Sequence, residues 1–347
     1  MKITSKEFGK TKNKEKVQEY TMTNDQGSSV SLLTLGGIIS EICVPDSEGT
    51  IKNVVASFDT VEGYESCPAF IGAAIGRTGG RISNALLSID HIDYPLAKND
   101  GENNLHGGPN GLDKAIWSVS QYQDKDKMSL SLHYLSPDME SGFPGELDCN
   151  ISYTFTNENT LTLKYTCTTD KKTYVNMTNH SYFNLSGDFT SKITDHILQI
   201  HSDNLVAVKE DTIPKALLPV SMTPFDFRFP KAIGKDIKSH HEQIIFGSGY
   251  DHAFELRHPL KGPNIIAEDP KTKRTLEVTT DAACVVFYTG NFLTEDYISR
   301  AGIPLHKRAA FCLETQDYPD AIHAPFVQAK FLEPGQVYRS QTSFKFT

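Results

Sequence analysis

The densest set of chemically active side chains lies in residues 176–187. The segment reads Asn-Met-Thr-Asn-His-Ser-Tyr-Phe-Asn-Leu-Ser-Gly, so that His180 and Tyr182 stand between Asn179 and Asn184. A half-buried strand alternates apolar and polar residues, whereas hydrogen-bonding groups here occupy both faces. Because buried polar groups need partners, the segment predicts a β-type run that lines a polar cavity suited to a ligand made of hydroxyl groups. A histidine satisfied within the core, beside turn asparagines, would also explain these residues.

Two glycine-rich segments hold further candidates. The first, GRTGGRIS at 76–83, contains Arg77 and Arg81, and the planar donor fork of arginine can clamp vicinal hydroxyls or carboxylates. For Arg77 we favour an anchor that holds the glycine loop by salt bridges. The second, NNLHGG at 103–108, places His106 by tight-turn backbone rather than by core packing. A plain hairpin turn fits the second segment equally well.

Two later segments supply carboxylates. In GYDHAFEL at 249–256, Asp251 could accept a hydrogen bond from a hydroxyl or cap a turn. Its neighbour His252 faces the opposite side of a strand, so the two cannot easily chelate one metal. Glu314 interrupts an apolar strand and is either ion-paired or held in a pocket with a tuned pKa. A carboxylate and a histidine can remove one proton and deliver another at neutral pH.

Composition excludes several classes of protein. The 34 Lys+Arg against 43 Asp+Glu give a net charge of −9, which argues against a nucleic-acid partner. No secretory signal and no membrane-length apolar run is seen, and the six cysteines lack CxxC spacing, so we expect free thiols in a reducing cytoplasm. Without GxGxxG, a P-loop or metal-ligand spacing, we expect no cofactor and no metal.

Strands must position these candidates. Residues 151–156 and 161–167 alternate apolar and polar residues around a turn at 157–159, which predicts a hairpin. A second hairpin is expected between 117–119 and 128–134, and the only helix candidates are short, such as 59–66. This pattern predicts one all-β domain over residues 1–347, a sandwich or barrel. Further strands are expected at 30–34, 193–200, 275–280, 284–289 and 342–346.

Taken together, the motifs resemble those of the aldose 1-epimerases, the galactose mutarotases. The resemblance implies a large, mostly antiparallel β-sandwich with an open cleft. It also implies an isomerase of hexose metabolism that interconverts the α and β anomers of free hexoses such as D-galactose and D-glucose. A hexose is then the expected partner, with a homodimer as a candidate assembly. Seven segments match in the family's order: GRTGGRIS, NNLHGG, SGFPGEL at 141–147, TNHSYFNLSG at 178–187, GYDHAFEL, FYTGNFL at 287–293 and FCLETQDYPDA at 311–321.

The resemblance also assigns roles to residues. Glu314 matches the general base that takes the proton from the C1 hydroxyl, and His180 matches the general acid that protonates the ring oxygen. The opened sugar rotates about C1–C2 and recloses with both proton transfers reversed. The remaining matched residues hold or surround the sugar: Arg81, His106 and Asp251 as hydroxyl and ring-oxygen contacts, and Tyr182 as part of the cleft wall.

Two positions depart from some relatives, and three other functions compete. Gly80 stands where some relatives carry Asn, and Val286 where some carry Gln, which leaves the preferred sugar open.

A hexose-6-phosphate epimerase would need basic residues such as Arg77, Arg81 and Arg228 at the cleft. A non-catalytic sugar-binding protein would lack Glu314 or His180, and both are present. A glycoside hydrolase would need a carboxylate pair such as Glu314 with Asp251.

Overall fold

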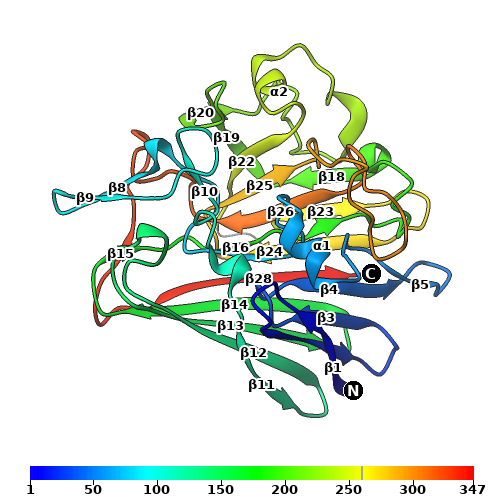
Figure 1. The fold of residues 1–347 in the computed structure, drawn as a ribbon. Helices are drawn as coiled ribbons and strands as arrows, with labels where there is room; N and C mark the ends of the chain where they lie inside the picture. The colour runs from blue at the N-terminus through cyan, green and yellow to red at the C-terminus, as the bar shows by residue number, and fades with distance from the viewer. Residues whose placement is uncertain (259–260) are drawn as a thin grey trace.

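Antiparallel strands dominate the computed structural model, which describes residues 1–258 and 261–347 (Figure 1). The largest sheet has nine strands in the order β11-β12-β13-β14-β28-β24-β23-β18-β21. Its strands are β11 (Ser118–Gln123), β12 (Lys127–Ser136), β13 (Leu147–Thr156), β14 (Thr160–Thr169), β28 (Tyr338–Phe346), β24 (Thr275–Thr280), β23 (Ile265–Glu268), β18 (Ile197–Ile200) and β21 (Lys231–Ala232).

A six-stranded sheet, in the order β17-β26-β25-β22-β19-β20, carries three of the six candidate residues, Tyr182, Asp251 and Glu314. In Figure 1 its strands β25 and β26 lie above strands β11–β14 of the larger sheet. The six strands are β17 (Tyr182–Phe183), β26 (Phe311–Gln316), β25 (Cys284–Tyr288), β22 (Asp251–Leu256), β19 (Ser202–Val208) and β20 (Pro214–Pro219).

The N-terminal segment forms a five-stranded meander, and the remaining strands form two-stranded ribbons. The meander runs through β1 (Lys2–Lys10), β2 (Lys16–Thr23), β3 (Ser29–Leu33), β4 (Ile39–Pro45) and β5 (Ile51–Asn53). The ribbons pair β7 (Arg81–Ile82) with β10 (Asn104–Leu105), β6 (Ala74–Ile75) with β16 (Thr178–Asn179), β15 (Thr173–Tyr174) with β27 (Phe331–Leu332), and β8 (Leu86–Ile89) with β9 (Ile92–Pro95).

The expected all-β architecture is confirmed, and so are both hairpins. The turn at 157–159 closes β13 onto β14, with Asn159 in the left-handed region at φ 53°. The expected helix at 59–66 is α1 (Val61–Ser66), capped by the Thr60 hydroxyl, which accepts a hydrogen bond from the Gly63 amide. A second short helix is α2 (Glu242–Phe246). The strand expected over 193–200 was too long, because residues 193–195 form a 3-10 turn before β18.

Alternation along the strands gives the six-stranded sheet two different faces. On β26, Phe311 and Leu313 belong to the main core, where the rings of Phe311 and Phe183 lie 5.9 Å apart and Phe183 also contacts Phe344 of the nine-stranded sheet at 5.6 Å. The intervening Cys312 and Glu314 point to the opposite face. The side-chain period of two therefore lets one strand hold the core and present a carboxylate elsewhere.

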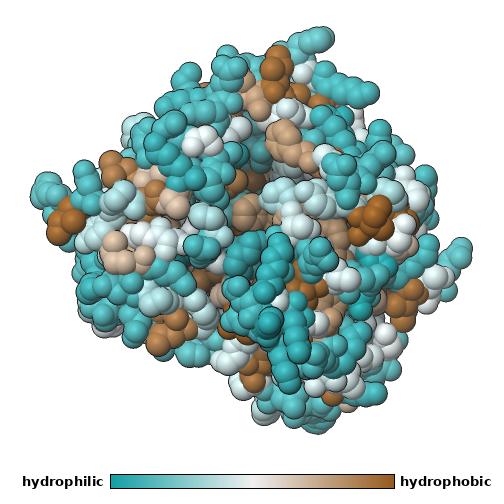
Figure 2. All heavy atoms as spheres, viewed as in Figure 1, coloured by the Kyte–Doolittle hydropathy of each residue, from teal (hydrophilic) through white to brown (hydrophobic). Residues whose placement is uncertain are grey.

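The surface and the cysteines agree with the composition. Figure 2 shows a face covered mostly by hydrophilic side chains, with apolar ones in separate small patches. Across residues 1–258 and 261–347, no helix has the length and apolar character needed to cross a membrane. All six cysteines are free, and five of them are buried.

Candidate active site

A cavity of about 210 Å³ opens on the face of the six-stranded sheet that points away from the main core. The six residues predicted from the sequence come from five separate segments of the chain, and all of them line this cavity. They are Arg81, His106, His180, Tyr182, Asp251 and Glu314.

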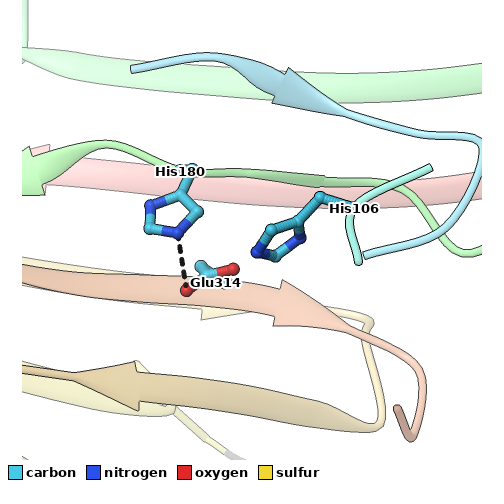
Figure 3. A group of neighbouring side chains, drawn as sticks. All are labelled: His106, His180 and Glu314. Carbon is cyan, nitrogen blue, oxygen red and sulfur yellow. Dashed lines mark ion pairs between the residues drawn. The ribbon is translucent and has the colours of Figure 1, made fainter. Parts of the chain in front are cut away.

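His180 and Glu314 face each other inside the cavity (Figure 3). His180 lies between β16 and β17, and its Nε2 is 3.6 Å from Oε1 of Glu314 on β26. Both residues are buried, with 5% and 3% of their surface exposed. An imidazole and a carboxylate are thus held close together on adjacent backbone segments, since β17 pairs directly with β26.

Burial sets the charge states of this pair. It lowers the pKa of His180 to about 4. It also raises the pKa of Glu314 well above its usual value, helped by the charge of Asp251 and opposed by Arg81. Burial therefore disfavours separated charges in the cavity. Because the two groups are so close, their protonation is a property of the pair rather than of either residue.

Aromatic rings hold the imidazole of His180 in place. The Tyr182 ring stacks on it, with centroids 4.9 Å apart and planes 14° apart. Phe70 is roughly parallel to it at 6.2 Å, and Tyr288 meets it edge-on at the same distance. These contacts leave the histidine little freedom to rotate away from Glu314.

His106 completes the cluster as a hydrogen-bond donor. The residue has a φ of 53°, and the next residue, Gly107, packs so tightly that a Cβ there would lie 2.1 Å from the Gly76 carbonyl oxygen. Nδ1 of His106 accepts a hydrogen bond from the Gly80 amide at 3.2 Å, so the neutral His106 ring carries its proton on Nε2. Burial lowers the pKa of His106 well below its usual value and thus favours this neutral form.

The same cluster could be considered for a metal ion, because one ligand atom each of His106, His180 and Glu314 lies within 4.8 Å of the others. The hydrogen bond from Gly80 argues against that use. A metal on Nε2 of His106 would need a lone pair there, which would move the proton to Nδ1 and against the Gly80 amide. The set is better suited to hydrogen bonding with oxygen atoms, and we assign no metal to it.

Arg81 and Asp251 add a cation and an anion to the cavity wall. Arg81 Nε is 2.6 Å from Asp100 Oδ2, which fixes one edge of the guanidinium. Burial raises the pKa of Asp251 to about 6, with Arg81 opposing the rise and Asp100 adding to it. Among the described residues the Asp251 carboxylate has neither an ion-pair nor a hydrogen-bond partner, so it is available to accept hydrogen bonds from a ligand.

The cavity has an apolar end, of which the sequence analysis had singled out only Val286. In the strand register, Val286 of β25 lies directly opposite Glu314 of β26, and Ala253 of β22 lies opposite Val286. Val206 of β19 continues this lining. Phe70 and Tyr288 also line the cavity and were missed, because buried apolar and aromatic residues look the same in sequence whether they face a core or a ligand.

Two expectations need correction. Residues 176–187 are not one β-type run but the short strands β16 and β17, which pair with β6 and β26. Asn179 and Asn184 do not reach the cavity, because they bond backbone carbonyls, at Gly72 for Asn179 and at Ala309 for Asn184. Arg77 is the anchor we favoured, but it is held by backbone carbonyls and Ser136 rather than by carboxylates.

Comparison with known proteins identifies the family. The family model described as aldose 1-epimerase matches residues 18–345. The chain belongs to the aldose 1-epimerase family. It is 36% identical to the galactose mutarotase of Bos taurus over 334 residues, covering 95% of this chain and 94% of that protein. It is also 36% identical to the aldose 1-epimerase of Escherichia coli K12, with 94% of each chain covered.

Solved structures of relatives share the fold over the whole chain. The galactose 1-epimerase of Lactobacillus acidophilus superposes with a TM-score of 0.88 at 27% identity, covering 100% of this chain and 99% of that one. An aldose epimerase homologue from C. elegans gives a TM-score of 0.85 at 27% identity, with 94% and 98% coverage. The expected mutarotase-type sandwich is thereby confirmed.

Proposed function

We propose that this protein is an aldose 1-epimerase that interconverts the α and β anomers of free hexoses such as D-galactose and D-glucose. The observation that carries the proposal is the buried His180–Glu314 pair, 3.6 Å apart in a cavity lined by further hydrogen-bonding groups. Opening a hemiacetal ring requires one proton to leave the C1 hydroxyl and one to reach the ring oxygen. A carboxylate and an imidazole that share a proton can do both.

The number of protons held by the His180–Glu314 pair fits the reaction. With one proton between them, the pair favours neutral His180 and protonated Glu314 before a sugar binds, because burial disfavours charge on either group. A sugar whose C1 hydroxyl donates to Glu314 and whose ring oxygen accepts from His180 favours the imidazolium and the carboxylate instead. Glu314 then removes the hydroxyl proton while His180 protonates the ring oxygen.

The open-chain aldehyde completes the cycle without leaving the site. Rotation about C1–C2 presents the other face of the carbonyl to the C5 hydroxyl. Reclosure returns the C5 hydroxyl proton to His180 and the Glu314 proton to O1, which restores the starting charges. No covalent intermediate with the protein is needed.

The other cavity residues bind and orient the sugar. His106 donates from Nε2 to a sugar oxygen, and Arg81 donates from the edge of its guanidinium that Asp100 leaves free. Asp251 accepts from hydroxyls, and Tyr182 forms a wall stacked behind His180. Each proton-transfer group typically contributes ~10²–10⁴-fold to the rate, and the binding groups hold the ring so that both transfers are in reach.

The arginines favour a free sugar over a sugar phosphate. Arg77 is buried, and its donors are occupied by backbone carbonyls and a serine. Arg228 pairs with Asp226 and does not line the cavity. Among the described residues only Arg81 brings a guanidinium to the cavity, and it is already paired with Asp100. A dianionic phosphate would need more positive charge than this.

Polarimetry tests the proposal directly. Freshly dissolved α-D-galactose and α-D-glucose are followed with and without the purified protein, and faster approach to the same final rotation is expected. If neither sugar responds, hexose 6-phosphates are tested next, and acceleration with those alone would replace the free-sugar assignment. We further propose that residues 1–347 act as one domain in the cytoplasm and that two copies of the chain form a homodimer. Sedimentation of the purified chain would test the homodimer.

A further inference from the structure

The Nδ1 edge of His180 has an unusual partner. Cys312 Sγ lies 3.4 Å from Nδ1, on the side of the ring opposite Nε2 and Glu314. Both residues are buried, and Cys312 has no exposed surface. The backbone of His180 also bonds its own ring and opposes the fall of its pKa, and among the other described residues Cys312 is the only hydrogen-bond partner found at Nδ1.

The contact follows from the strand register. Cys312 is two residues before Glu314 on β26, so both side chains point to the same face of the sheet. In the same register Cys312 stands between Tyr182 of β17 and Tyr288 of β25, the two tyrosines whose rings contact His180. The thiol therefore lies beside Nδ1 of the imidazole, while the Glu314 carboxylate lies near its other nitrogen, Nε2.

A thiol differs chemically from the usual partners of a catalytic histidine. A backbone carbonyl or a carboxylate can only accept, and so it keeps a proton on Nδ1. A thiol is a weak donor and a weak acceptor. It can donate to Nδ1 when the neutral ring carries its proton on Nε2, and it can accept when the ring is doubly protonated. Burial raises the pKa of the Cys312 thiol well above its usual value, which keeps the S–H proton in place.

We propose that Cys312 is a positioning residue: its thiol satisfies Nδ1 of His180 in both protonation states, so that Nε2 always faces Glu314 and the substrate. The inference rests on the proposed epimerase function, because it concerns the proton that His180 delivers. Cys312 itself touches no reacting atom. Its contribution is to hold the imidazole in the orientation that points Nε2 at Glu314, without fixing a proton on Nδ1.

Two substitutions separate this role from packing. Cys312→Ser keeps a donor and acceptor but removes some apolar volume, whereas Cys312→Val fills the volume but removes the hydrogen bond. We expect Cys312→Val to lower kcat roughly 10-fold with little change in KM, at the lower end of the effects seen for outer partners of metal-bound histidines. Cys312→Ser should stay close to the wild type. A purely structural role predicts the reverse order.

The pH profile provides a second readout. In Cys312→Val the imidazolium has an unpartnered Nδ1–H, so the alkaline limb of kcat, where the His180–Glu314 pair loses its proton, should move to lower pH. The serine variant should keep the limb or move it upward. The other groups facing the pair are unchanged in both variants, namely Tyr182, Tyr288, His106, Asp251 and Arg81.

Cys284 offers a matched control. It is equally buried on the neighbouring strand β25, but it pairs with Gln316 in the register and does not line the cavity. Cys284→Val should leave kcat and the pH profile unchanged. The inference is overturned if Cys312→Val keeps the wild-type kcat and pH limb, if only the serine variant loses activity, or if Cys284→Val is equally impaired. Absence of anomerisation by the wild type would instead refute the proposed function.

Discussion

Replacing Asp251 with asparagine should stabilise the protein and weaken sugar binding at the same time. The carboxylate is held in the cavity, and burial raises its pKa from 3.8 to about 6. No ion pair within the described residues compensates for that burial. The wild type therefore keeps a charge that is costly to the fold, and the neutral amide of similar shape avoids the cost.

The pKa shift fixes the sign and the size of the stability effect. Between pH 3.8 and about 6 the folded state binds more protons at this site than the unfolded state, so wild-type stability falls as the pH rises through that window. A rise of roughly 2 pKa units corresponds to at most about 3 kcal/mol of unfolding free energy. Asparagine does not titrate, so the stability gain of the variant should be absent below pH 4 and complete above pH 6.

The cost of the substitution should appear in binding. A hydrogen bond from a sugar hydroxyl to a carboxylate is worth about 1.5–3 kcal/mol. Its loss should therefore raise KM roughly 10- to 100-fold, while kcat falls less, because Asp251 does not transfer the protons in the proposed mechanism. Stability and function thus oppose each other at this position.

Urea unfolding at several values between pH 4 and pH 8 measures the stability difference, and initial anomerisation rates at pH 7 measure KM. Asp126→Asn, in an exposed turn beside Lys125, serves as the control with no expected pH-dependent gain. A variant of Asp251 that is no more stable than wild type at pH 8, or equally stabilised at pH 4 and pH 8, would refute the burial argument.

Two other predictions concern the loop anchor and the apolar end of the cavity. Arg77→Lys keeps the charge but loses the fork that bonds Ser136 and the Gly145 carbonyl, so the unfolding free energy should fall by about 2–4 kcal/mol; an unchanged urea midpoint would contradict the anchor. Val286→Gln places an amide beside Glu314 in the register and should change the ratio of kcat/KM for galactose and glucose by roughly 10-fold, in steady-state rates with both sugars; an unchanged ratio would show that this strand position does not contact the sugar.

Much of the fold was predictable because a strand with one buried face alternates apolar and polar residues along the sequence. The period-two alternation along 151–156 and 161–167 gave the central hairpin, since one face of each strand is core. The sequence did not show where a strand begins when a turn precedes it, as at residues 193–195. Nor did it show that 176–187 forms two short strands, because their partners β6 and β26 lie far away in the chain.

The site was predictable at positions where a polar or ionisable residue stands in a buried segment, because burying such a residue is costly unless it has a partner or a function. Glu314 in an apolar strand and His180 among polar neighbours are of this kind, but a structural role explained each equally well until the resemblance to the aldose 1-epimerases assigned them as base and acid. Asn179 was misplaced because an amide that bonds loop carbonyls looks the same in sequence as one that bonds a ligand. Tyr288 and Val286 were not placed in the cavity from chemistry, because only the strand register brings them beside Glu314.

The central claim is that Glu314 and His180 together move the two protons of ring opening. Its most direct test is the enzyme-dependent rate of α-D-galactose anomerisation for Glu314→Gln, His180→Asn and the double variant, with thermal unfolding as the check on folding. The enzyme-dependent rate should fall ~10²–10⁴-fold in each single variant. It should fall little further in the double variant, because the two residues act as one unit. A folded Glu314→Gln variant that keeps near-wild-type turnover, or losses that multiply in the double variant, would contradict the account.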